Sequence, residues 1–95
     1  MIRLVVKYRL KEGLREEFLG KVKGEGLQSA SEKDAGNIQY DFYLSEKDPD
    51  ELVLLEAWES DEAIGAHCEA PHFKRMMEVE KEYAESVNVE KYVSE

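Results

Sequence analysis

The two histidines of this chain, His67 and His72, lie in one short stretch that reads AHCEAPHF, residues 66–73. They are five positions apart with Pro71 between them, whereas two histidines that bind zinc from one helix are four positions apart. Cys68 is close in sequence, but no third ligand stands at a spacing that suggests a metal site. We therefore expect no metal here.

His67 is the candidate for acid–base chemistry. It follows Ala63 and Ile64 by about one helical turn, which places it on the apolar side of a short predicted helix, facing the sheet. There the imidazole would act as a base inside an aromatic pocket. The alternative is a core histidine whose ring bonds a strand carbonyl. A Cys–His nucleophilic pair is not supported, because His67 and Cys68 are neighbours and point roughly 100° apart on a helix.

Glu56 is the one charged residue of LVLLEAW, residues 52–58. A buried carboxylate needs a hydrogen-bond partner or has a raised pKa, so we expect Glu56 either to orient a neighbour or to titrate as a second group. Aromatic residues near it would shape an apolar cage for a substrate, with His72 at the entrance. The residues of this cage are Tyr8, Tyr40, Trp58 and Phe73.

Strands are predicted wherever apolar and polar residues alternate. This pattern occurs at residues 2–10, 38–44 and 86–93. Residues 52–58 are apolar on both faces apart from the glutamate, which is typical of a strand covered on both sides.

Helices are predicted where apolar residues recur about every 3.6 positions. One runs from residue 14 to about residue 30, with two glycines at 24 and 26 that each weaken it by about 1 kcal/mol, so a kink or early fraying is expected. A second is capped by Ser60 and runs to about Cys68. A third begins at Pro71, a residue suited to the first helical position, and its inner stripe includes Met76, Met77 and Glu80.

The order of these elements, β-α-β-β-α-β, is the ferredoxin-like α+β pattern, a four-stranded antiparallel sheet with helices on one face. The length fits one domain, residues 1–95. Because the helices cover only one face, the doubly apolar strand at 52–58 requires cover on the other. A second copy of the sheet would supply it, so we expect a homodimer.

The charge balance excludes several partners. The net charge is −9 and the pI is near 4.7, whereas nucleic acids and anionic membrane surfaces attract clustered Lys and Arg. Basic residues at positions 3, 7 and 9 interrupt the first strand, so we expect neither a signal peptide nor a membrane span. A single cysteine fits a reducing cytoplasm.

Two segments carry a family resemblance. LEAWESDEAIGAHCEAPHFKRM, residues 55–76, and GNIQYDFYLSEKDPDELVLLEAWES, residues 36–60, resemble the signature of the antibiotic biosynthesis monooxygenase-like (ABM) family. The resemblance covers essentially the whole chain and implies a dimeric α+β barrel, in which two ferredoxin-like subunits pack sheet to sheet. It is less specific for activity, because this fold hosts several chemistries.

The resemblance implies a cofactor-independent monooxygenase of the quinol type. Relatives of this kind need neither metal nor flavin, since a deprotonated dihydroxy aromatic is electron-rich enough to reduce dioxygen itself. We therefore expect a small quinol or polycyclic aromatic and O₂ as partners, no cofactor, and His67 as the general base.

Two other functions remain open on the same fold. One is isomerisation of a phosphorylated signalling sugar of the autoinducer-2 type. The acidic net charge disfavours such a substrate, although Arg3, Lys7 and Arg9 could form a local basic patch. The other is a non-enzymatic dimeric ligand-binding or stress protein, in which His67 would be satisfied by backbone hydrogen bonds and no cavity would reach it.

Haem degradation, a further activity of related proteins, is not expected. That branch relies on an asparagine in the first strand, a tryptophan in the second helical region and a histidine further on. The corresponding positions here hold Tyr8, His67 and Met77.

Overall fold

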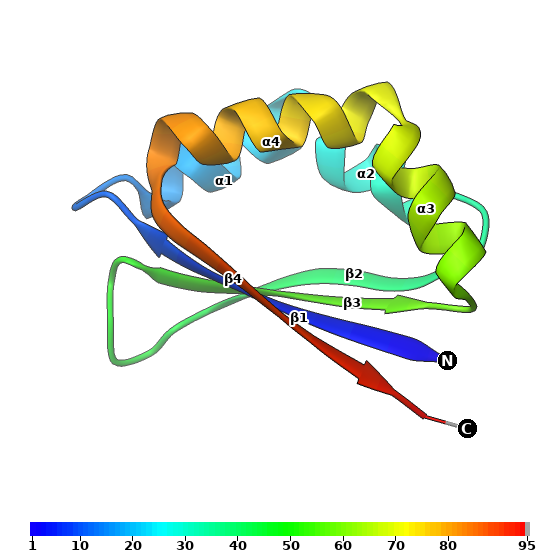
Figure 1. The fold of residues 1–95 in the computed structure, drawn as a ribbon. Helices are drawn as coiled ribbons and strands as arrows, with labels where there is room; N and C mark the ends of the chain where they lie inside the picture. The colour runs from blue at the N-terminus through cyan, green and yellow to red at the C-terminus, as the bar shows by residue number, and fades with distance from the viewer. Residues whose placement is uncertain (95) are drawn as a thin grey trace.

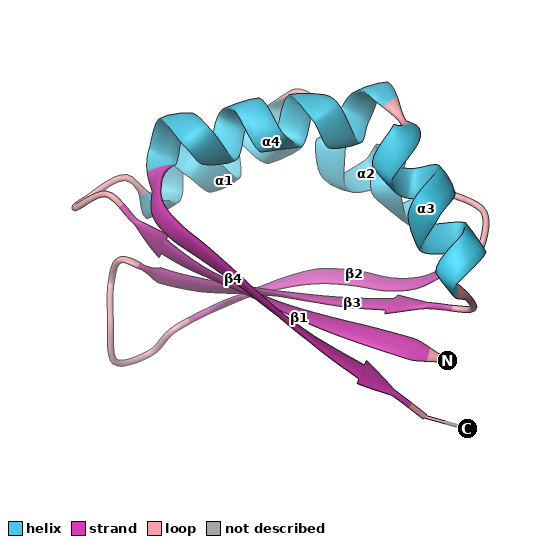
Figure 2. Ribbon diagram, viewed as in Figure 1, coloured by secondary structure: helices cyan, strands magenta, loops and turns pink. Residues whose placement is uncertain are grey.

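The computed structural model describes residues 1–94, within which one four-stranded antiparallel sheet carries four helices on one face (Figures 1 and 2). The strand order is β2-β3-β1-β4. This arrangement confirms the predicted ferredoxin-like α+β fold. The elements are β1 (Ile2–Leu10), α1 (Arg15–Gly24), α2 (Leu27–Glu32), β2 (Asn37–Leu44), β3 (Glu51–Trp58), α3 (Asp61–Glu69), α4 (Pro71–Tyr83) and β4 (Ala84–Val93).

The core lies between the helices and the central strands β1 and β3. Val6 pairs with Leu54 and Tyr8 pairs with Leu52, and all four side chains are buried in one cluster. Alternation along β1 sends these residues to one face of the sheet. Fully burying an aliphatic side chain of this size contributes roughly 1.5–3 kcal/mol to folding, so the alternation decides which face meets the helices.

The first predicted helix is two helices rather than one kinked helix. Helix α1 ends at Gly24 and α2 begins at Leu27. Between them Gly26 has φ +71, a left-handed conformation that glycine adopts without a steric penalty. The glycines therefore break the helix completely instead of only weakening it.

The second predicted helix starts where the sequence indicates. The Ser60 hydroxyl accepts a hydrogen bond from the Ala63 N–H at 3.2 Å, so Ser60 caps α3 as expected. Pro71 occupies the first turn of α4.

The last strand is only partly covered by the helices. Val87 and Val89 lie on the helix side of the sheet, opposite Tyr8 and Val6, but they remain 41% and 57% exposed. Strand β4 is an edge strand, and in Figure 1 it runs out from beneath the helices. On α4, Met77 was expected on the inner stripe and is 54% exposed.

The helix-free face of the sheet is apolar at its centre and charged at its margin. Val5, Val53 and Leu55 are only partly buried there. Ala57 is fully buried, because Arg3 donates a hydrogen bond to the Gln39 side chain at 2.7 Å and both of these residues pair with Ala57.

Within residues 1–94, none of the helices combines the length and the apolar character that crossing a bilayer requires.

Candidate functional site

A cavity of about 290 Å³ lies between the helix side of the sheet and helices α3 and α4. Its walls are largely apolar, and among residues 1–94 its lining contains no Lys or Arg. The apolar lining includes Leu4, Val6, Leu54, Ile64, Phe73 and Met76, and the polar groups are those of Tyr8, Tyr40, Glu56, His67 and Glu80. Five of the residues expected at the site, Tyr8, Tyr40, Glu56, His67 and Phe73, therefore border one cavity.

Trp58 and His72 differ from the other predicted site residues, because neither is among the residues that line this cavity. Trp58 packs behind the site, with its ring centroid 4.7 Å from that of His67. His72 was expected at the entrance, but the exposed lining residues are Met77, Val87 and Val89. The cavity therefore opens along β4.

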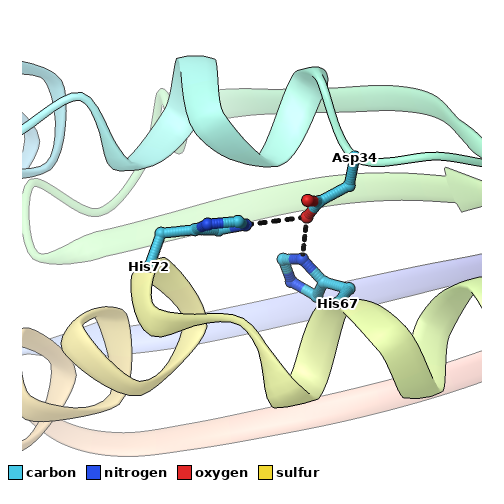
Figure 3. A group of neighbouring side chains, drawn as sticks. All are labelled: Asp34, His67 and His72. Carbon is cyan, nitrogen blue, oxygen red and sulfur yellow. Dashed lines mark hydrogen bonds and ion pairs between the residues drawn. The ribbon is translucent and has the colours of Figure 1, made fainter.

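His67 and His72 meet at one carboxylate oxygen that the sequence did not reveal (Figure 3). Oδ2 of Asp34 lies 2.6 Å from Nδ1 of His67 and 2.7 Å from Nε2 of His72. The three side chains come from the turn between α2 and β2, from α3 and from α4. The carboxylate therefore ties the turn after α2 to two consecutive helices whose histidines lie 33 and 38 positions further along the chain.

Gly36 allows the Asp34 turn to approach α3. Its φ is +83, and a Cβ at this position would stand 2.5 Å from the Cβ of Ala63. The Gly36 carbonyl also accepts a hydrogen bond from the Glu59 N–H at 2.8 Å. Only glycine fits both the backbone conformation and the space, so the sequence DAGN positions the carboxylate as well as ending a helix.

The Asp34 carboxylate fixes the orientation and tautomer of His67. A carboxylate accepts hydrogen bonds, so in the neutral form of His67 the proton is on Nδ1 and Nε2 carries the free lone pair. His67 is only 5% exposed. Within residues 1–94 its Nε2 has no hydrogen-bond partner, yet the atom keeps accessible surface. Because His67 lines the cavity, this lone pair is available to a ligand.

The same contacts act on Asp34. Burial alone would raise the pKa of its carboxyl group, but the hydrogen bonds from His67 and His72 outweigh burial and hold that pKa below its ordinary value. Asp34 is therefore the anionic partner of the pair.

Asp34, His67 and His72 are also the group that could hold a metal ion, with one ligand atom each and all three atoms within 4.8 Å of one another. Adjacent ligands of a metal with bonds of about 2.1 Å stand about 3 Å apart at a right angle. The separations of 2.6 and 2.7 Å are shorter and are those of charge-assisted hydrogen bonds. The arrangement fits a hydrogen-bonded cluster better than a set of metal ligands.

Glu56 fulfils both of the roles considered for it. Its Oε1 accepts a hydrogen bond from the Trp58 indole N–H at 2.9 Å, so it orients a neighbour. Burial raises the pKa of Glu56 to about 7, against the opposing effect of the Trp58 hydrogen bond. Glu56 is therefore a carboxyl group in the cavity wall that titrates near neutral pH.

Glu80 forms a second carboxylate site further along the cavity. The Tyr8 hydroxyl donates a hydrogen bond of 2.5 Å to Oε2 of Glu80. Burial raises the pKa of Glu80, although the Tyr8 bond acts against it. Tyr8 thus holds a carboxylate in place, beyond the cage-shaping role expected for it.

A family model described as antibiotic biosynthesis monooxygenase, ABM, matches residues 1–79. The chain belongs to the antibiotic biosynthesis monooxygenase family. The Bacillus subtilis protein named "Putative monooxygenase YcnE" is 33% identical over 82 residues, which are 86% of this chain and 84% of that protein. Membership in the ABM family supports a monooxygenase-like function in general terms.

Solved structures of ABM-like proteins have the same fold. A conserved protein from Methanosarcina mazei gives a TM-score of 0.89 at 26% identity, covering 99% of this chain and 92% of that one. A protein from Bacteroides thetaiotaomicron, described as a possible oxidoreductase, gives 0.85 at 32% identity, covering 96% and 94%. A "Putative antibiotic biosynthesis monooxygenase" from Nitrosomonas europaea gives 0.86 at 24% identity, covering 99% and 98%, and this last likeness shows the fold alone.

Two residues of this ABM site were not identified as functional from the sequence. Asp34 gave no signal, because it stands in a turn 33 positions from His67 and 38 from His72. Glu80 stood out only as an acidic residue on the apolar stripe of its helix, a position where a buried acid needs a partner.

Proposed function

We propose that this chain is a cofactor-independent monooxygenase that oxidises a small quinol or related dihydroxy aromatic, with His67 as the general base. The observation that carries the proposal is the hydrogen bond between Asp34 and the buried His67 at the wall of an apolar cavity. It prepares Nε2 of His67 to accept a proton where a ligand would bind.

The first step is deprotonation of the substrate. A phenolic hydroxyl group in the cavity donates its proton to Nε2 of His67. The imidazolium that forms is stabilised by Asp34, as in other carboxylate–histidine pairs. Apolar walls exclude water and strengthen these electrostatic interactions.

The second step is reduction of O₂ by the substrate anion. Quinol and O₂ give a hydroxyquinone and water. One oxygen atom replaces a ring hydrogen, the O–O bond breaks, and the other oxygen leaves as water. The quinol loses the four electrons that O₂ gains, so the reaction balances without any other reductant.

The size and walls of the cavity suit such a substrate. A cavity of about 150 Å³ holds benzene, so about 290 Å³ accommodates one ring with substituents or two fused rings. Tyr40 and Phe73 lie at the His67 end, with ring centroids 6.2 and 5.1 Å from that of His67. These aromatic faces would pack against a planar substrate.

The phosphosugar isomerase receives no support from this geometry. Arg3, Lys7 and Arg9 alternate along β1 with the cavity-lining residues, so they lie on the opposite face of the sheet. A phosphate in the cavity would meet carboxylates instead of the basic patch.

The hypothesis of a non-enzymatic protein requires that His67 forms its hydrogen bonds with backbone groups and that no cavity lies beside it. His67 instead bonds a carboxylate and borders a cavity. The hypothesis of an enzyme is therefore better supported than the hypothesis of a non-enzymatic protein.

The proposal includes a homodimer formed through the helix-free face of the sheet. Its support is the strip of Val5, Val53 and Leu55, which the single chain leaves partly exposed. Two such strips packed together would remove this apolar surface from water, and the charged residues at the margin would form a polar rim.

The test is oxygen uptake with a panel of hydroquinones at neutral pH. Wild type is expected to consume one O₂ per quinol without releasing hydrogen peroxide, and one labelled oxygen atom from ¹⁸O₂ should enter the product. His67→Gln, which cannot accept the proton, should lower the rate about a hundredfold. Glu69→Gln, an exposed change in the same helix, should leave the rate unchanged. Equal rates for wild type and His67→Gln across the panel would refute the proposal.

A further inference from the structure

The cavity contains hydrogen-bond acceptors that the proposed base does not use. One oxygen of Glu56 is bonded to the Trp58 indole, and one oxygen of Glu80 is bonded to the Tyr8 hydroxyl. Within residues 1–94 the second oxygen of each carboxyl group has no partner, yet it keeps accessible surface. Both residues line the cavity, so each can offer a ligand an open acceptor.

The two carboxyl groups are associated with different ends of the cavity. Glu56 pairs with Leu4 of β1, and Tyr8 stands four residues further along that strand, which is about 13 Å. On α4, Glu80 follows His72 by eight residues, or about 12 Å along the helix axis. His67 belongs to the Glu56 end, because its ring packs on Trp58. Glu80 therefore enters the cavity from a backbone position further along the sheet than those of His67 and Glu56.

The electrostatics of the cavity disfavour anions. Two carboxyl groups line it and, among residues 1–94, no Lys or Arg does. Burial, followed by repulsion from Glu80, raises the pKa of Glu56 even though the Trp58 bond opposes this. A carboxylate or phosphate on a ligand would meet the same burial and repulsion with no cation to offset them.

We propose that Glu56 and Glu80 are specificity-determining residues, which restrict the cavity to uncharged aromatic ligands with hydrogen-bond donors at both ends and reject carboxylated or phosphorylated ones. The inference rests on the proposed function for the aromatic nature of the ligand. Glu80, held by Tyr8, binds the donor furthest from His67. Glu56 excludes negative charge beside the base.

The experiment compares two ligands that differ in charge but hardly in shape. Para-hydroxybenzamide and para-hydroxybenzoate share the ring and the hydroxyl group, and binding of each is measured by isothermal titration calorimetry at pH 8. Wild type is expected to bind the amide at least about tenfold more tightly than the carboxylate, since like-charge contacts cost several kcal/mol. Glu56→Gln and Glu80→Gln should each lower the ratio of the affinities for the amide and the carboxylate at least about threefold.

Glu82→Gln is the matched control. It removes one negative charge from the same helix, but at an exposed position, and it should leave the ratio unchanged. Wild type that binds the carboxylate as tightly as the amide, or more tightly, would overturn the proposal. It would also be overturned if neither cavity variant changed the ratio of the two affinities, or if the control variant lowered that ratio as much as they do. Absence of binding by both ligands at millimolar concentration would also overturn it.

The binding ratio separates this inference from the monooxygenase proposal. Calorimetry with these ligands requires neither O₂ nor turnover. Oxygen uptake could be absent while the affinities for the two ligands differ as expected in wild type and in the variants. The monooxygenase proposal would then fail, and the proposed ligand selectivity would stand. The wild-type ratio alone decides the matter if a cavity variant does not fold.

Discussion

Asp34 and His67 are joined through Oδ2 and Nδ1 at 2.6 Å, across 33 positions of sequence. The bond favours the neutral tautomer with its proton on Nδ1, and the buried imidazole borders the cavity. His72 donates to the same oxygen at 2.7 Å. Asp34 thus holds the base and, through His72, the start of α4.

Asp34→Asn should lower kcat/KM for quinol oxidation about a hundredfold or more. The amide can present its NH₂ group to Nδ1 and so stabilise the wrong tautomer of His67. His72→Gln is the matched comparison, because it removes a bond to Asp34 while the Asp34–His67 bond remains, and it should cost less than about tenfold. Oxygen uptake measures both. Similar losses in the two variants would mean that Asp34 only holds the helices together.

Glu56→Gln should change how stability depends on pH. The pKa of Glu56 rises from an ordinary 4.5 to about 7 on folding, so between these values the folded state binds the extra proton. The contribution of Glu56 to the free energy of unfolding therefore falls by roughly 3 kcal/mol as pH rises from about 4.5 to 7. Between pH 5 and pH 8, the free energy of unfolding measured in urea should decrease less for Glu56→Gln than for wild type. An identical decrease in both proteins would contradict the assignment, and Glu82→Gln serves as the exposed control.

Gly36→Ala should destabilise the protein by about 2 kcal/mol or more and lower activity. The new Cβ would require a left-handed conformation and would stand 2.5 Å from the Cβ of Ala63, which displaces the Asp34 turn. Gly20→Ala, within α1 and with open space around its Cβ position, should instead stabilise by up to about 1 kcal/mol. Thermal unfolding of both variants tests the contrast, and equal changes would refute the role of the close approach.

If the chain forms the proposed homodimer, Leu55→Lys should convert it to monomers without unfolding the chain. It places a charge at the centre of the helix-free face, beside Val5. Met77→Lys, a similar change at an exposed position on α4, should leave the dimer intact. Sedimentation at micromolar concentration measures the outcome. A wild-type protein that sediments as a single chain would rule out the dimer.

Dialysis against a chelator should leave oxygen uptake unchanged, because the substrate supplies all four electrons in the proposed reaction. The readout is the rate before and after dialysis, with the metal content measured in parallel. Loss of activity that is restored by one divalent metal would instead assign Asp34, His67 and His72 as ligands.

The sequence predicts features that depend on neighbouring positions. Alternation placed Tyr8 on the helix side of β1, and helical spacing placed His67 facing the sheet; the structure has both there. The break at Gly26 was expected only as a weakness, because spacing cannot show that the following residues restart as a separate helix.

Such patterns cannot predict contacts between segments that are distant in the chain. The Tyr8–Glu80 bond joins residues 72 positions apart, and the Asp34 cluster requires a turn and two helices to meet. The direction of the Asp34 carboxylate depends on the contact of Gly36 with α3, which no local pattern in the sequence shows. For the same reason His72 was expected at the entrance and lies on Asp34 instead.

The edge position of β4 separates two uses of the sheet. Val87 and Val89 border the cavity and remain partly exposed on the helix side, whereas Val5 and Leu55 lie on the reverse side. In the proposed homodimer a ligand would come and go along β4 while the second copy stays bound behind the sheet, so the proposed assembly and the proposed turnover would not compete for the same surface.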